Sequence, residues 1–156
     1  MDEIRKKIFP DPTYDDRERD SAYRALIEIA RFASKNGTNV LVDATAHKRL
    51  WRDLARAAFG KEYIEVNVRC PVEVCIERET KREQKGSIRS KLYEDALERL
   101  KTGKKVLGLG KVPGVDEPFE ESESEIVVDS SKLGDEEAAN CVLRDINHYL
   151  LSRTLR

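Results

Sequence analysis

Asp43 is the residue whose type and position point most directly to chemistry. It ends the apolar run Val40 to Val42, and two small residues, Ala44 and Thr45, follow it. A carboxylate at the carboxyl end of a buried strand can face bound phosphate and position a magnesium ion, as in many nucleoside triphosphate enzymes. A helix-capping or turn carboxylate is the alternative interpretation of Asp43.

The usual phosphate-binding partner of such a carboxylate is absent from the sequence. That partner is a glycine-rich loop, G-x-x-x-x-G-K-[ST], whose backbone N–H groups and lysine hold the phosphates. The pattern does not occur in these 156 residues. We therefore expect the chain to be the greater part of a phosphoryl-transfer domain whose phosphate loop is missing.

A second group of candidates is a segment rich in basic side chains. Its members are Arg78, Lys81, Arg82, Lys85, Arg89, Lys91, Arg99, Lys101, Lys104 and Lys105. Such a segment predicts a lid, at about 78–122, that closes over an anionic substrate and contributes cations to phosphoryl transfer. Acidic residues alternate with the basic ones, so a solvated helix face is the alternative.

His47 and Trp51 follow Asp43 closely but are not predicted to act in a reaction. Neither His47 nor His148 has a partner at catalytic or metal-ligand spacing. Trp51 lies on the helix expected after Asp43, and we expect its ring to pack in the core rather than to stack on a base.

Composition and charge exclude several classes of partner. The 29 basic and 30 acidic residues nearly cancel, which does not favour binding to nucleic acid or to a membrane surface. No apolar run approaches the roughly 18 residues that a membrane span requires. We therefore expect a cytoplasmic protein that forms one domain over residues 1–156.

The elements that position these residues follow from hydrophobic periodicity and turn signals. Helices are predicted at about 16–35, 46–59, 71–84 and 92–100 and from about 135 onward. Short apolar strands are predicted at 39–43, 63–68 and 126–128. Strands that alternate with helices predict an α/β fold with a parallel sheet. Ligands of such sheets bind at the carboxyl ends of the strands, where Asp43 is expected.

Several segments carry motifs in a consistent order. Residues 2–5 look like the end of D-G-D-x-x-R, and residues 16–20 look like a degraded D-R-x-E-N. Residues 63–79, YIEVNVRCPVEVCIERE, are similar to a strand followed by P-L-E-V-C-x-x-R-D, and residues 114–120, GVDEPFE, are similar to G-I-D-D-P-Y-E. Together these segments resemble adenylylsulfate kinase, the small P-loop kinase of sulfate assimilation that phosphorylates the 3′-hydroxyl of adenosine 5′-phosphosulfate.

The resemblance implies a P-loop kinase-like parallel sheet with flanking helices, without its N-terminal strand and phosphate loop. It also implies ATP and magnesium as cofactors and a small-molecule nucleotide as the substrate. Asp2 would be the carboxylate near the attacking 3′-hydroxyl, and Arg5 and Arg17 would hold the phosphosulfate nucleotide. Arg78 would lie beside the ATP.

The chain departs from the family pattern at several site positions. Asp20 stands where the family has an asparagine and Lys91 where it has a lid lysine and glycine, and both are expected to contact the substrate. Ala22 and Tyr23 stand where the family has two arginines. Asp43 is more typical of other small P-loop kinases, in which it would be catalytic and hold magnesium through water.

The missing strand has a physical consequence. In the family it lies between the strands expected here at 39–43 and 63–68, and each backbone group left buried and unpaired costs about 1 to 3 kcal/mol. We expect a homo-oligomer or an N-terminal segment to complete the sheet, and little or no kinase activity from these residues alone. The alternatives are a P-loop kinase for another hydroxyl acceptor and a non-catalytic nucleotide-binding remnant.

Overall fold

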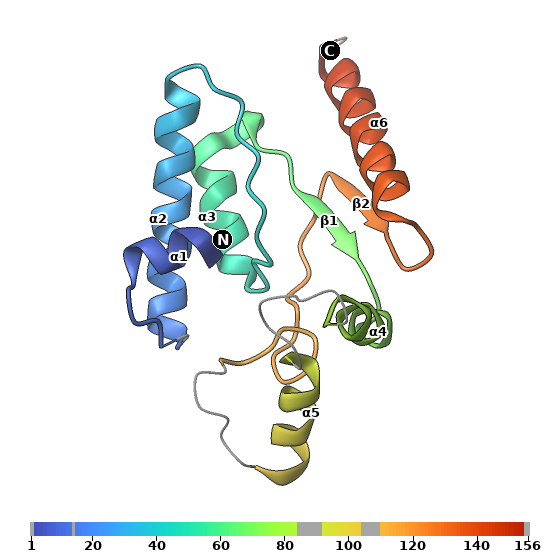
Figure 1. The fold of residues 1–156 in the computed structure, drawn as a ribbon. Coiled ribbons are helices and arrows are strands. Elements are labelled where there is room, and N and C mark those ends of the chain that lie inside the picture. Colours follow the sequence, from blue (N-terminus) through green and yellow to red (C-terminus); the bar gives the residue numbers. More distant parts are fainter. Residues whose placement is uncertain (1, 14, 84–91, 104–109, 155–156) are drawn as a thin grey trace. The chain divides into compact units, whose positions relative to one another are not determined.

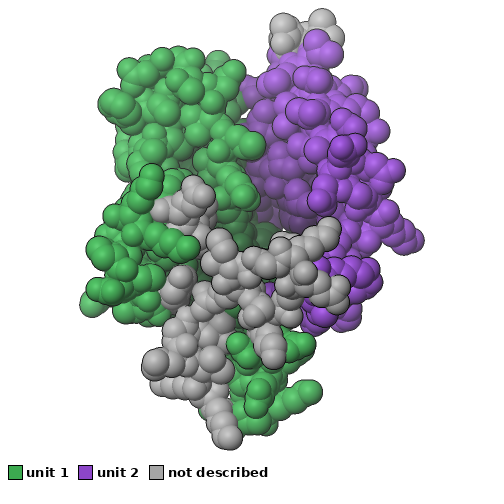
Figure 2. All heavy atoms as spheres, viewed as in Figure 1, with its two compact units in different colours: residues 1–63, 91–121 green, residues 64–90, 122–156 purple. Residues whose placement is uncertain are grey.

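The structure is a computed structural model that describes residues 2–13, 15–83, 92–103 and 110–154. The chain forms two compact units, coloured separately in Figure 2. The first unit comprises Met1–Tyr63 and Lys91–Glu121, and the second comprises Ile64–Ser90 and Ser122–Arg156. That the whole chain is one domain stays a prediction.

Helices build the first unit. They are α1 (Asp2–Ile8), α2 (Asp16–Lys35), α3 (Arg49–Phe59), the short 3-10 helix η1 (Gly60–Glu62) and α5 (Leu92–Thr102). The second unit combines two strands with two helices: β1 (Val66–Arg69), α4 (Val72–Glu83), β2 (Ile126–Asp129) and α6 (Asp135–Thr154). No helix among the described residues is both long and apolar enough to cross a membrane.

Helix α2 begins and ends where the sequence predicts. Asp15 caps its first turn, because one side-chain oxygen accepts a hydrogen bond from the Glu18 N–H at 2.8 Å. That hydrogen bond also holds the pKa of the Asp15 carboxyl below its usual value. Gly37, just after the helix, has a φ of 79°, a left-handed conformation that ends a helix without strain.

The core of the first unit forms where α2 packs against α3. Tyr23 of α2 stacks on Trp51 of α3, with ring centroids 4.0 Å apart and planes inclined by 17°. The Trp51 Nε1–H donates a hydrogen bond to Asp20 at 3.0 Å, so the buried indole has a polar partner. The prediction that Trp51 packs in the core is confirmed.

The second unit contains the sheet. β1 and β2 are parallel, and Val66 pairs with Ile126 while Arg69 pairs with Asp129. Helix α6 packs against β2 in this unit. A small parallel sheet with flanking helices confirms the predicted α/β class.

One predicted strand is wrong. Residues 39–43 form no strand, and in the described part of the chain the sheet consists of β1 and β2 alone. Val40, Leu41 and Val42 are 42%, 94% and 47% exposed, respectively, whereas a buried strand was predicted. A local apolar run favours a strand, but the strand forms only when a neighbour accepts its backbone hydrogen bonds, and none of the described strands pairs with this run.

Three other elements differ from the prediction. Helix α3 begins at Arg49 rather than at residue 46, because Ala46 has a φ of 41° and cannot belong to a right-handed helix. Helix α1 was not predicted. The strand predicted at 63–68 is displaced to Val66–Arg69.

Candidate functional site

A turn before α3 shapes the site. The left-handed Ala46 lies at its centre, and two side chains hold the turn in this conformation. The Ala46 N–H donates to the Tyr23 hydroxyl at 2.7 Å, and Arg52 donates to the carbonyl oxygens of Ala46 and Glu120. The turn therefore depends on α2, on α3 and on the loop at 110–121, and it fixes the direction of Thr45 and His47.

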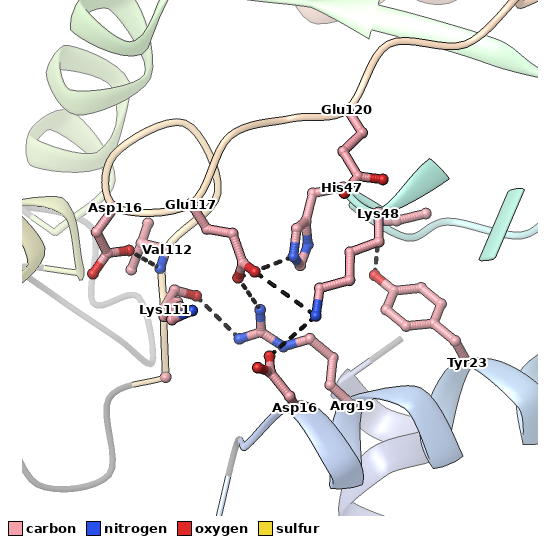
Figure 3. Close-up of polar contacts among 12 residues, drawn as sticks. Asp16, Arg19, Tyr23, His47, Lys48, Lys111, Val112, Asp116, Glu117 and Glu120 are labelled. Atoms are coloured by element: carbon pink, nitrogen blue, oxygen red, sulfur yellow. Dashed lines mark hydrogen bonds and ion pairs between the residues drawn. The ribbon is translucent and has the colours of Figure 1, made fainter. Parts of the chain in front are cut away.

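The loop at 110–121 is folded by its own polar contacts. Asp116 accepts a hydrogen bond from the Val112 N–H at 2.5 Å, and it also pairs with Arg99 of α5. Gly114 has a φ of 85° and donates from its N–H to the Glu117 carbonyl oxygen at 2.8 Å. This turn directs the Glu117 side chain toward α2 and the Ala46 turn, as Figure 3 shows.

Three side-chain nitrogens lie close to the Glu117 carboxylate (Figure 3). Arg19 Nη1 lies 3.4 Å and His47 Nε2 lies 3.1 Å from Glu117 Oε2, and Lys48 Nζ lies 3.8 Å from Oε1. Two of these side chains, Arg19 and Lys48, have other partners as well. Arg19 donates to the Lys111 carbonyl oxygen at 3.0 Å, and Lys48 donates to Asp16 at 3.3 Å.

His47 is almost fully buried, with 1% of its surface exposed. Burial lowers its pKa below the usual 6.5, although the nearby Glu117 carboxylate acts in the opposite direction. The edge of the imidazole faces the Trp51 ring, with centroids 5.1 Å apart. His47 is therefore neutral at neutral pH, and one of its ring nitrogens remains an acceptor.

A cavity of about 220 Å³ opens within the first unit. Its lining residues are Arg5, Arg19, Tyr23, Asp43, Ala44, Thr45, His47 and Pro113. Arg5 Nε lies 3.5 Å from Glu18 Oε1, and both side chains are buried. Cationic, hydroxyl and imidazole groups thus surround a small space that has one carboxylate at its wall, a donor-rich environment that suits an anionic ligand with hydroxyl groups.

The structure brings together two of the predicted site residues, Arg5 and Asp43, which both line the cavity. Arg17 lies on the exposed face of α2. Asp20 does not line the cavity; its carboxylate accepts hydrogen bonds from Trp51 and from Arg24 at 2.7 Å. Those two hydrogen bonds, the one from Arg24 first, lower the pKa of Asp20.

The other predicted site residues lie elsewhere or are not described in full. Asp2 belongs to the backbone of α1, and its side chain is outside the described part of the structure. Arg78 belongs to the second unit, where its guanidinium donates to the carbonyl oxygens of Ser130 at 2.7 Å and Leu133 at 3.2 Å. Lys91 and residues 84–90 and 104–109 lie outside the described residues, so the lid stays a prediction.

Sequence reasoning missed Arg19, His47 and Glu117. Arg19 could have been found from helix phase, because it lies four residues before the buried Tyr23 and therefore on the same face of α2. Arg17 is rotated by about 200° around the helix from Arg19. No local signal identified His47, because its carboxylate partner follows it by about 70 residues.

Magnesium, which the family resemblance implies, would find one carboxylate at the cavity, that of Asp43. Among the described residues, no three His, Cys, Asp or Glu side chains gather closely enough to hold a metal ion. Mg²⁺ usually keeps several waters and binds through one or two carboxylates together with substrate phosphates. Asp43 fits that pattern as a single protein ligand.

Comparison with known proteins gives one consistent result. The sequence model of a family described as adenylylsulphate kinase matches residues 1–129. A probable adenylyl-sulfate kinase of Archaeoglobus fulgidus is 36% identical over 132 residues, which are 84% of this chain and 74% of that protein.

Two further relatives have similar names. A probable adenylyl-sulfate kinase of Pyrococcus abyssi is 32% identical over 144 residues, covering 92% of this chain and 72% of that protein. An adenylyl-sulfate kinase of Geotalea uraniireducens is 28% identical over 145 residues, covering 92% of this chain and 62% of that protein. With the match to the family model, these similarities establish that the chain belongs to the adenylylsulfate kinase family.

Proposed function

We propose that the cavity of the first unit is the acceptor site of an adenylylsulfate kinase, in which adenosine 5′-phosphosulfate binds before ATP phosphorylates its 3′-hydroxyl. The observation that carries this proposal is the pair of buried arginines, Arg5 and Arg19, in the wall of one cavity. Membership in a family whose relatives carry that name supports the identity of the acceptor.

The arginines account for the anionic part of the substrate. A guanidinium presents a planar set of N–H donors that matches the oxygens of a phosphate or sulfate group. Arg5 is held by Glu18 and Arg19 by the Lys111 carbonyl oxygen, so little side-chain freedom is lost when a ligand binds. Two prearranged cations suit the phosphosulfate group of adenylylsulfate.

The groups for phosphoryl transfer are a further part of the proposal. Asp2 and Asp43 are the proposed catalytic carboxylates, of which Asp43 lines the cavity. Bound magnesium would neutralise charge on the transferring phosphoryl group, and Asp43 would contribute one carboxylate to it. Arg78 is proposed to lie beside ATP. Membership in this kinase family also supports the proposal of a cytoplasmic location.

Turnover is expected to need more than the described cavity. Phosphoryl transfer depends on holding the triphosphate, and the 156 residues contain no G-x-x-x-x-G-K-[ST] loop. We therefore expect these residues alone to bind adenylylsulfate with little or no kinase activity. A longer chain that supplies a phosphate loop and its strand is expected to turn over with ATP and magnesium.

The exposed run at 40–42 supports a partner strand. Leu41 is 94% exposed and both neighbours are valines, a composition that favours β structure. We propose that an N-terminal segment or a second copy of the chain pairs with this run. The amides of residues 40–42 should be protected from hydrogen exchange in a concentrated sample of the chain, or in the chain fused to the N-terminal segment of a curated relative. Unchanged exchange rates in both would contradict this part.

A kinase for another hydroxyl acceptor is the second candidate. It is favoured by Asp20, which stands where the family has an asparagine and which is expected to contact adenylylsulfate. The Asp20 carboxylate instead accepts hydrogen bonds from Trp51 and Arg24 and does not line the cavity. Calorimetric titration of the chain with adenylylsulfate, adenosine 5′-monophosphate and a panel of phosphorylated alcohols separates the two candidates. We expect adenylylsulfate to bind most tightly; tighter binding of another acceptor would favour the second candidate, and no heat with any of them would reject both.

A further inference from the structure

The surroundings of Glu117 look like those of a bound oxyanion. One oxygen, Oε2, is approached by Arg19 Nη1 at 3.4 Å and by His47 Nε2 at 3.1 Å, while Lys48 Nζ approaches the other at 3.8 Å. The donors come from α2 and from the turn before α3, and the acceptor comes from the loop at 110–121 (Figure 3). Two cations and a buried imidazole nitrogen around one pair of oxygens form the kind of polar set that can bind phosphate or sulfate, and His47 Nε2 has no hydrogen-bond partner among the described residues.

We infer that Arg19, His47 and Lys48 form a subsite for a phosphate- or sulfate-type oxyanion, and that Glu117 occupies this subsite when no ligand is bound. A carboxylate oxygen and a phosphate oxygen accept the same N–H donors, so the two compete. Arg19 and His47 also line the cavity, and an oxyanion that enters it reaches them directly. Only the identity of the ligand, adenylylsulfate, rests on the proposed function.

The donors are held in place independently of Glu117. The second guanidinium nitrogen of Arg19 donates to the Lys111 carbonyl oxygen at 3.0 Å. Lys48 keeps Asp16 as a second partner at 3.3 Å, and the ring of His47 is packed against Trp51. The subsite therefore keeps its shape when the Glu117 carboxylate moves away. If Glu117 were instead the residue that holds these side chains in place, the subsite would lose its shape.

The charges around the subsite favour replacement of the Glu117 carboxylate by an oxyanion ligand. Arg19 and Lys48 supply two positive charges, and Glu117 returns a single negative charge to them. The carboxylate of Asp16 also faces Lys48, and Asp43 lies at the cavity wall, so these two acidic groups limit the gain. A phosphosulfate or pyrophosphate group carries more negative charge than one carboxylate and gains correspondingly more from the same donors.

The test compares Glu117→Gln with wild type by calorimetric titration, using adenylylsulfate and inorganic pyrophosphate as separate probes. Glutamine keeps the size of the side chain and removes its charge, so the competing ion pair is lost. We expect E117Q to bind both probes at least about fivefold more tightly. Glu121→Gln is the matched control, because it removes one negative charge from an exposed position on the same loop, and its affinities should equal those of wild type.

The outcomes separate this inference from the proposed function. If wild type binds adenylylsulfate and E117Q binds it equally or more weakly, Glu117 is a scaffold and the inference is wrong while the function stands. If only pyrophosphate binds, and E117Q binds it more tightly, the subsite stands and adenylylsulfate is the wrong ligand. Binding of neither probe to either protein would reject both.

A second variant protects the test against loss of folding. Trp51 is the only tryptophan in the chain, and its fluorescence reports whether each variant keeps the core of the first unit. If E117Q fails this check, Glu117→Asp replaces it, because the shorter side chain keeps its charge but withdraws from the donors. E117D is also expected to bind pyrophosphate more tightly than wild type, and weaker binding would overturn the inference.

Discussion

The Tyr23 hydroxyl is predicted to hold the turn that shapes the cavity, and Tyr23→Phe tests this. The hydroxyl accepts the Ala46 N–H at 2.7 Å, and Tyr23 is only 5% exposed. Phenylalanine preserves the stacking on Trp51 and removes the hydroxyl that accepts this hydrogen bond. An N–H left without an acceptor inside a protein costs about 1 to 3 kcal/mol.

The expected loss lies toward the lower end of that range, because Ala46 is only half-buried and water can partly replace the hydroxyl. We expect the free energy of unfolding to fall by about 1 to 2 kcal/mol. If the free energy of unfolding falls by about 2 kcal/mol per molar urea, the midpoint of the urea unfolding curve should fall by roughly 0.5 to 1 M.

Urea titration followed by Trp51 fluorescence measures this loss, because the single tryptophan lies in the first unit and stacks on Tyr23 itself. Tyr149→Phe is the matched control: the same atom is removed from a half-buried tyrosine of α6 in the second unit. A midpoint for Y23F indistinguishable from those of wild type and Y149F would refute the account of the turn.

Two further predictions concern the same turn. Ala46→Gly should be more stable than the control Ala44→Gly by about 1 kcal/mol in urea, because glycine relieves the left-handed backbone only at Ala46; equal stabilities would count against that strain. Burial holds the pKa of His47 below 6.5, so the unfolded chain binds a proton that the folded chain does not, and the free energy of unfolding should decrease as the pH falls below about 6.5. His47→Gln should flatten this part of the pH profile measured by urea titration, and an unchanged slope would contradict the assignment.

The helices were predictable where their signals are local. Both ends of α2 were found because Asn36 and Gly37 end the helix and the apolar period defines its length. The start of α3 was not, because its N-cap residue, Lys48, makes no side-chain cap. The Arg49 N–H instead donates to Glu120 at 2.6 Å, a carboxylate about 70 residues away, which periodicity cannot reveal.

The contacts of the candidate site could be anticipated from the sequence only in part, for a similar reason. The family motif pointed to Arg17, whereas the geometry of helix α2 places Arg19 at the cavity. The position of Arg19 follows from the helical period, which is a local property of the sequence, and the motif carries no such information. His47 was set aside as a lone histidine, because its partner Glu117 lies far along the chain. Asp43, predicted from the sequence, lines the cavity, although the strand expected to present it does not form.

The central claim is that adenylylsulfate binds in the cavity lined by Arg5 and Arg19. Its most direct test is a calorimetric comparison of wild type, Arg19→Gln and Arg17→Gln, two equal changes of charge on one helix. Loss of a charged hydrogen-bond donor costs about 1.5 to 3 kcal/mol, so R19Q should bind adenylylsulfate at least about tenfold more weakly, and R17Q should bind like wild type. Weak binding by R17Q with unchanged binding by R19Q would contradict the account. It would indicate instead that adenylylsulfate binds at the face of α2 that carries Arg17, as the family motif predicts.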